Sequence, residues 1–168
     1  IYNRTFSSGT GGNVTVNASE LVEFSGFVPN GANSISAYTL SASKAGKIDI
    51  FARRLFLSDG AIISNTTFNR GAGGTITVNV ESIELIGTSN GNGALFANSF
   101  GAGNSGDIVI NTRTLSVLNG GRLTTASFST GDGGNINVNA SESVEVSASN
   151  PTDATPSRIR SSVAIASE

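Results

Sequence analysis

Short segments in which β-branched and polar residues alternate recur along the chain, and each begins with a glycine. These glycines are spaced 34, 28, 32 and 28 residues apart, at Gly12, Gly46, Gly74, Gly106 and Gly134. The second and fourth positions after each glycine are always Val or Ile. Side chains two positions apart share one face of a strand, so both columns are expected to point into a common core. The columns are Val14, Ile48, Ile76, Ile108 and Ile136, followed by Val16, Ile50, Val78, Ile110 and Val138.

Two further apolar segments complete each repeat. A second strand is predicted at 21–24, 55–57, 83–85, 115–117 and 144–146. A third strand precedes the next glycine and carries two apolar columns, and a Gly-rich corner such as 71–74 or 131–134 closes the circuit. One column lies six positions before each anchor glycine, at Phe6, Leu40, Phe68, Phe100 and Phe128. The other lies five residues earlier in the third strand, at Ile35, Ile63, Leu95, Leu123 and Ile159.

A repeat of three short strands cannot bury its apolar stripe alone, whereas stacked repeats bury it continuously. Stacking places like residues over like at about 4.8 Å. The sequence therefore predicts an all-β fold, a right-handed single-stranded parallel β-helix (β-solenoid) with three strands per circuit and about five full circuits plus partial ends. Helices are disfavoured because Gly, Asn, Ser and Thr dominate and a 3.6-residue period is lacking.

The same repeat defines the domain organisation. Residues 1–168 are expected to form a single β-solenoid segment. The chain starts at Ile1, not Met, and neither end of the sequence resembles a capping unit. We therefore expect it to be a fragment of a longer chain.

Composition narrows the function classes. The chain has no His and no Cys, which removes the usual zinc, haem and thiol chemistry and the Ser-His-Asp and Cys-His mechanisms. Its net charge of −2 argues against nucleic-acid binding, which normally needs a basic face. Apolar runs near 18 residues are absent, so membrane insertion is not expected. We expect no cofactor, no metal and no catalytic residue.

Longer stretches of sequence also recur. Gly-Asn-Val-Thr-Val-Asn-Ala-Ser-Glu at 12–20 returns as Gly-Asn-Ile-Asn-Val-Asn-Ala-Ser-Glu at 134–142. With Ser-Phe-Ser-Thr-Gly-Asp-Gly-Gly at 127–134 and Leu-Ser-Val-Leu-Asn-Gly-Gly at 115–121, they resemble filamentous-haemagglutinin-type, S-layer-like repeat exoproteins of cyanobacteria. The resemblance covers essentially the whole chain. It implies an extracellular or cell-surface location and an outer-membrane β-barrel as secretion partner.

Asparagine fills the fifth position after four of the five anchors, with Phe51 as the exception. Stacked Asn side chains can hydrogen-bond from circuit to circuit, and Asn also tolerates the backbone of a corner. A structural ladder is therefore expected. The alternative is a glycan-binding or glycosylated row, because two of these residues begin Asn-X-Ser sequons. The column is Asn17, Asn79, Asn111 and Asn139.

Charges of opposite sign alternate at the start of the second strand. Opposite charges on adjacent strands stabilise a sheet and like charges destabilise it, so this row is expected to help specify which circuit stacks on which. An exposed ion- or ligand-binding stripe is the alternative. The row is Glu20, Arg54 (with Arg53 beside it), Glu81, Arg113 and Glu142.

Long and short circuits alternate because three insertions follow the second strand, at 26–33, 87–93 and 147–157. All three are expected at one corner, and insertions on one face of a solenoid often form a binding surface. The alternative is tolerated variation in loop length. Candidate contact residues are Phe27, Val28, Pro29, Asn30, Asn90, Asn92, Asn150, Pro151 and Asp153.

The sequence favours a non-enzymatic stalk or adhesin rod that displays loops for contact with other cells. Surface glycans are candidate ligands of these loops. A self-associating fibre, sheath or S-layer-like subunit, contacting copies of itself or neighbouring exoproteins, is the alternative. A β-helix enzyme acting on polysaccharide is a remote third hypothesis. Its acids would be Glu20, Glu81 and Glu142, but each has an arginine neighbour and lacks an apolar pocket.

Overall fold

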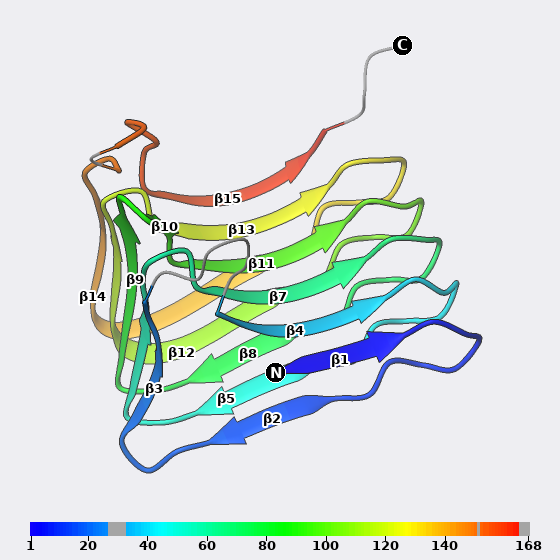
Figure 1. The fold of residues 1–168 in the computed structure, drawn as a ribbon, viewed down its shortest axis with the longest axis horizontal. Coiled ribbons are helices and arrows are strands. Elements are labelled where there is room, and N and C mark those ends of the chain that lie inside the picture. The colour runs from blue at the N-terminus through cyan, green and yellow to red at the C-terminus, as the bar shows by residue number, and fades with distance from the viewer. Residues whose placement is uncertain (27–32, 151, 165–168) are drawn as a thin grey trace.

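The computed structural model describes residues 1–26, 33–150 and 152–164. These residues contain strands and turns but no helix, and therefore no helix long and apolar enough to cross a membrane. The chain winds into a parallel β-solenoid of about five turns (Figure 1). The all-β fold class predicted from the repeat is confirmed.

One strand of each turn lies in a six-stranded sheet, called face A. Its strands, in spatial order, are β1 (Tyr2–Thr5), β4 (Ser34–Thr39), β7 (Ile62–Thr67), β11 (Ala94–Ser99), β13 (Arg122–Ser127) and β15 (Arg158–Val163). Every neighbouring pair in this sheet is parallel. Each turn therefore adds one strand at the same place and in the same direction.

The other two strands of each turn form a nine-stranded sheet with two parts. Face B1 follows the anchor glycines and contains β2 (Val14–Asn17), β5 (Ile48–Phe51) and β8 (Ile76–Asn79). Face B2 contains β3 (Leu21–Phe24), β6 (Arg54–Leu57) and β9 (Ser82–Thr88), and the two-residue β10 (Gly91–Asn92) pairs antiparallel with β9. Two long strands run through both faces, β12 (Ile108–Leu118) and β14 (Ile136–Ser147).

The predicted core columns are in register from turn to turn. Ile48 pairs with Ile76, Ile76 with Ile108, and Ile108 with Ile136. The first three are fully buried, and the column five residues before the Phe column is buried equally well from Ile35 to Leu123. Stacked β-branched side chains fill the interior without a helix or a second layer.

The anchor glycines repeat because the backbones of adjacent turns meet there. A Cβ on Gly74 would overlap the carbonyl oxygen of Gly46, and a Cβ on Gly106 would overlap that of Gly74. Only glycine fits this close approach. The buried amide of Asn65 also bonds to both neighbours, donating to Gly46 O at 2.6 Å and accepting from Gly74 N at 3.0 Å.

The Phe column does not belong to the core. Phe68, Phe100 and Phe128 are 48%, 49% and 44% exposed, and Phe6 and Leu40 are exposed as well. Each follows the last residue of a face A strand, and the preceding side chain, such as Ser99 before Phe100, takes the inward position. Alternation along the strand therefore turns the ring outward.

Candidate functional site

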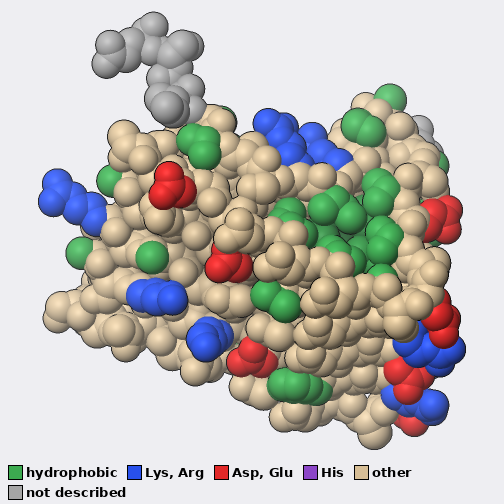
Figure 2. All heavy atoms as spheres, turned by 180° about the vertical axis from the view of Figure 1, so that it is seen from behind, with side chains coloured by type: hydrophobic (Ala, Val, Ile, Leu, Met, Phe, Trp, Pro, Cys, Tyr) green, Lys and Arg blue, Asp and Glu red, His purple; other side chains and the backbone are tan. Residues whose placement is uncertain are grey.

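The row of alternating charges lies at the corner between faces B1 and B2, where Figure 2 shows acidic and basic groups alternating along one edge. Arg53 bridges two turns, with Nη1 3.5 Å from Glu20 Oε2 and Nε 3.3 Å from Glu81 Oε1. Arg113 Nη2 lies 2.5 Å from Glu142 Oε1. These contacts keep all five side chains at one exposed edge.

The structure corrects one member of this row, because Arg53 and not Arg54 lies between Glu20 and Glu81. Arg54 is the first residue of β6 and pairs with Leu21 and Ser82, on face B2 itself. The sequence held a signal for this difference. Every member of the row lies two positions before the first inward aliphatic residue of the second strand, which is Leu55 in this turn.

The ion pairs raise the pKa of both arginines above their ordinary value. For Arg53 the hydrogen bond to Glu81 is the largest cause, and for Arg113 it is the hydrogen bond to Glu142. All these groups are exposed, so the pairs contribute modestly to stability and are screened by salt. The row favours correct stacking of turns more than it adds overall stability.

Three of the four predicted asparagines form a ladder along the outer side of face B1. Asn111 Nδ2 donates to Asn79 Oδ1 at 2.8 Å, and Asn139 Nδ2 donates to Asn111 Oδ1 at 2.9 Å. Asn17 stands apart because its neighbour in the next turn is Phe51, which offers no amide. The ladder therefore extends over the last three of the five B1 strands.

The loops between faces B2 and A lie at a single corner, and a network of hydrogen bonds links successive turns there. Asp59 Oδ1 accepts from Thr88 Oγ1 at 2.7 Å and from Asn90 Nδ2 at 3.3 Å, and Asp59 Oδ2 accepts from Gly26 N at 3.1 Å. These bonds lower the pKa of Asp59, the Thr88 hydroxyl being the largest cause and the Gly26 amide the next. One carboxylate thus connects the loops of three turns.

Asn150 is buried, which corrects its assignment as a contact residue. It is only 4% exposed, and its Nδ2 donates to Thr88 O at 2.9 Å across two turns. Its Oδ1 accepts from Thr152 N at 2.8 Å, and its side-chain amide lies 2.7 Å from that of Asn92. Asn150 therefore holds the third long loop against the second.

The remaining candidate loop residues divide into two groups. Asn90 and Asp153 are exposed, and Asn92 is partly exposed. The pKa of Asp153 is lowered mainly by the Thr155 backbone N–H, which donates to its Oδ1 at 2.9 Å. The other candidates lie outside the described residues: Phe27, Val28, Pro29, Asn30 and Pro151.

The short turns at the loop corner are tight enough for the long loops of neighbouring turns to lie directly on them. Asp59–Gly60 and Asn119–Gly120 have positive φ at both central residues, as in a type I′ turn, and a backbone bond closes each one. A Cβ on Gly120 would lie 2.7 Å from the Cβ of Asn150. The glycine lets the long loop lie directly on the short turn.

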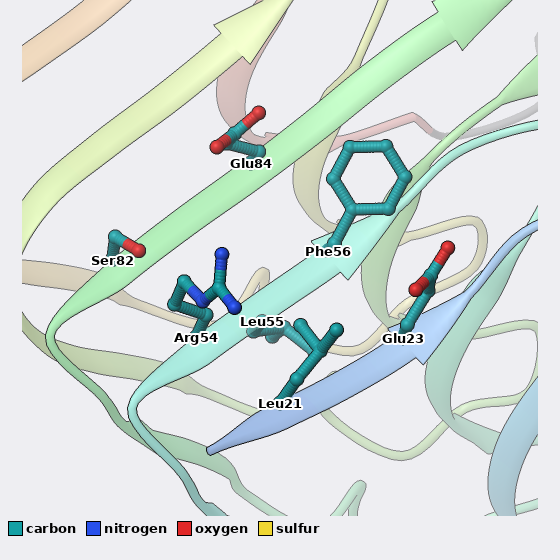
Figure 3. Close-up of a pocket in the computed structure, with 7 residues that line it drawn as sticks. All are labelled: Leu21, Glu23, Arg54, Leu55, Phe56, Ser82 and Glu84. Atoms are coloured by element: carbon teal, nitrogen blue, oxygen red, sulfur yellow. The ribbon is translucent and has the colours of Figure 1, made fainter.

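Face B2 carries a shallow groove of about 260 Å³ on its outer side (Figure 3). Glu23, Phe56 and Glu84 come from three neighbouring strands and lie side by side by register. Glu23 accepts a hydrogen bond from Ser25 Oγ at 2.8 Å. Both carboxylates are exposed, with the partly exposed ring of Phe56 between them, and Arg54 lies beside that ring along β6. The exposed charged groups around the Phe56 ring make this groove suitable for contact with polar groups of another molecule.

Sequence reasoning missed the outward aromatic row on face A. The ring centroids of Phe68 and Phe100 are 5.4 Å apart and those of Phe100 and Phe128 are 4.8 Å apart, with nearly parallel planes. Tyr38 meets Phe68 edge-on at 6.0 Å. The rings therefore cover one another's faces and present mainly their edges to solvent.

Arg4 lies between two tyrosine rings at the first turn of face A, 5.1 Å from the centroids of both Tyr2 and Tyr38. A groove of about 510 Å³ opens beside it, lined also by Phe6 and Phe68. Cation–π contact orders the arginine side chain at this exposed position. Together, the aromatic row and this groove give the outer side of face A an apolar surface beside the loops that lead to face B1.

Comparison of the chain with family models, with curated proteins and with solved structures finds no match. Within the described residues, groups of three or more acidic side chains that could hold a metal ion are also absent.

Proposed function

We propose that this chain is a non-enzymatic, stiff segment of an extracellular surface protein, and that it displays the loop corner for contact with other cells or their glycans. The parallel pairing of each turn with the next carries the proposal, and its register shifts between Thr112 and Thr114, where β12 pairs with β14. Every turn hydrogen-bonds along its backbone to its neighbours. Side-chain contacts between turns add to this in the charge row, in the Asn ladder and at the loop corner. A structure of this kind resists bending because bending would break many parallel contacts at once.

The arrangement of the loops supports display as the role of the segment. The long loops that the structure describes, after β9 and β14, emerge at one corner, while the other two corners turn within a few residues or through glycines. Asp59 and Asn150 hold neighbouring loops together by side-chain bonds. A surface assembled from several loops on a rigid support is typical of binding faces in repeat proteins. The motif resemblance to filamentous-haemagglutinin-type exoproteins agrees with this role.

Immunogold electron microscopy of the producing cells tests the location and the role together, using an antibody against residues 1–168. Sparse label on projecting fibrils would support the stalk and justify a glycan screen. Label confined to the cytoplasm would refute an extracellular role. A variant with 87–92 replaced by the two-residue Asn-Gly turn keeps the stalk, because Gly93 then follows the turn as Gly121 follows Asn119–Gly120. It removes one loop and should lose cell binding if the loops make the contact.

A self-associating fibre or sheath is the second candidate, and the exposed Phe row favours it. Phe68, Phe100 and Phe128 form an apolar ridge along the side of the rod. Burying such a ridge between two rods would remove apolar surface from water. A continuous labelled coat in the same micrographs, and sedimentation coefficients that rise with concentration and fall back in Phe100→Ser, would favour the fibre.

A further inference from the structure

Face A brings three arginines together on its outer side at the last two strands. Arg122 of β13 lies directly opposite Arg158 of β15, and Thr124 lies opposite Arg160. Leu123 between the two β13 positions is fully buried, so the alternation turns Arg122 and Thr124 outward. Adjacent parallel strands are about 4.8 Å apart, which places like charges side by side, an arrangement that destabilises a sheet.

In the described part of the chain, this concentration of positive charge has no acid paired with it. In residues 1–26, 33–150 and 152–164, none of the three arginines has a carboxylate oxygen within 4.0 Å. Arg122 Nη2 lies 3.1 Å from the side-chain amide of Asn92, and its attraction is a minor cause of the lowered pKa of Asp153. The Arg158 and Arg160 guanidinium groups make no comparable contact in the described part of the chain.

Three polar side-chain atoms of the described residues are buried without a hydrogen-bond partner, and all three lie on face A. Arg158 Nε and Thr124 Oγ1 lie on adjacent strands within the arginine cluster, and the third atom, Asn98 Oδ1, lies on β11. Burial without a partner normally costs stability, so an unpaired donor and an unpaired hydroxyl together indicate a missing acceptor. Burial also lowers the pKa of Arg158, and the positive charges of Arg122 and Arg160 lower it further.

We propose that Arg122, Thr124, Arg158 and Arg160 form a binding site for a tetrahedral oxyanion, the sulfate or phosphate group of a larger ligand. Guanidinium groups bind such oxygens through pairs of parallel hydrogen bonds. Three arginines and a hydroxyl can satisfy three or four oxygens, more than a carboxylate offers. The site lies on the outer side of face A, where β13 and β15 begin beside the loop corner. It does not depend on the proposed surface role.

The surroundings favour a single charged group over a long polyanion. The chain as a whole carries a net charge of −2, and the outer side of face B2 carries Glu23, Glu84 and Glu145. A nucleic acid would need a continuous basic surface. Partly exposed Phe96 lies directly opposite Thr124 on β11, where it can cover an uncharged part of the ligand, such as a sugar ring.

Titration calorimetry of the 168-residue chain tests the site, with inorganic sulfate, inorganic phosphate and a sulfated hexasaccharide as probes. The variant Arg158→Gln/Arg160→Gln should weaken binding by about tenfold or more, because it removes charge-assisted hydrogen bonds. The matched control, Arg54→Gln/Arg70→Gln, removes the same charge from exposed positions elsewhere and should leave affinity nearly unchanged. Hexasaccharide binding far above that of the inorganic ions would identify a glycan as the source of the group.

Either of two results would overturn the proposal. Equal weakening in both double variants would show general attraction to positive charge, and absence of heat with all three probes would show that the cluster does not bind oxyanions. Folding is checked by thermal melts without ligand, where Arg158→Gln/Arg160→Gln should melt no lower than the original chain because it relieves repulsion. Arg160→Gln alone, at an exposed position, provides a second variant should the double substitution unfold the chain.

Discussion

The Ile column of face B1 and the Phe row of face A are equally regular in sequence but lie on opposite sides of the wall of the solenoid. Ile48, Ile76 and Ile108 are fully buried, whereas the Phe rings of the row are nearly half exposed. Regular repetition along a solenoid therefore indicates that side chains stack, and does not by itself indicate that they are buried. An outward ring still gains from the rings above and below it, as the 4.8 Å and 5.4 Å centroid distances show.

Truncating a buried member of the Ile column should have the largest effect. Ile108→Ala leaves a cavity between two stacked turns and should lower the free energy of unfolding by about 2–5 kcal/mol. Its neighbour Val109 points outward, so Val109→Ala should cost less than about 1 kcal/mol. Urea titrations followed by circular dichroism measure both. Equal losses would contradict the inward assignment of the column.

The Phe row should contribute less to the free energy of unfolding than the Ile column does. Phe100→Ala removes two stacked pairs and should lower the free energy of unfolding by about 1–2 kcal/mol. Phe6, which is 70% exposed and lies outside the stacked pairs, should change it by no more than about 0.5 kcal/mol when replaced by Ala. The same urea titrations decide the matter. A loss for Phe100→Ala as large as that for Ile108→Ala would remove the distinction between row and column.

Polar side chains outside the core can also connect turns. The pH dependence of stability tests this for the hydrogen bonds of Asp59. Its pKa is lower in the folded chain than in the unfolded chain, so its contribution is complete above about pH 4 and is lost as pH falls through the folded value. The denaturation midpoint of the original chain should therefore fall more on acidification than that of Asp59→Asn.

Thr88→Val removes the main donor to Asp59 and provides the control for that experiment. It should bring the pKa of Asp59 back towards its ordinary value and remove much of the same pH dependence. Identical acid profiles for the three chains would show that the Asp59 bonds do not stabilise the loop corner.

The charge row should show the smallest effect and the strongest dependence on salt. Arg113→Glu places an acid beside Glu142 and near Glu81, so it should lower the melting temperature at low ionic strength. The difference should shrink near 1 M salt, where screening is strong. Arg54→Glu, at a position without an ion pair in the described residues, is the control. A salt-independent loss in Arg113→Glu would indicate a packing defect instead of repulsion.

The repeat of the sequence was sufficient to predict the solenoid, its anchor glycines and its main core columns. These follow from strand periodicity and from close backbone approach, which are local properties of the chain. The Phe row was misplaced because its rings follow the last strand residue, where a hydroxyl such as that of Ser99 fills the interior instead. Polar interior positions that bond to a Gly-rich corner cannot be recognised from apolar patterning alone.

The candidate sites were less predictable because they depend on contacts between turns. Arg53 could have been chosen over Arg54 from its distance to Leu55, whereas the burial of Asn150 arises from a loop two turns away and could not. The arginine cluster was not recognised because the partners Arg122 and Arg158 are 36 residues apart, a separation that matches neither the long nor the short repeat. The inserted loop between them sets their alignment.

The alternation of acid and base at one corner also imposes a parity rule on the length of the rod. Glu20, Glu81 and Glu142 recur every second turn, so the chemical period along the axis is two turns although the backbone period is one. Removing one inner turn would bring like charges together, two carboxylates or two arginines, whereas removing two neighbouring turns would leave the alternation unbroken. Duplication or engineering of this molecule should therefore proceed in units of about sixty residues, and a neighbour that recognises one such unit would find the same surface at every second step.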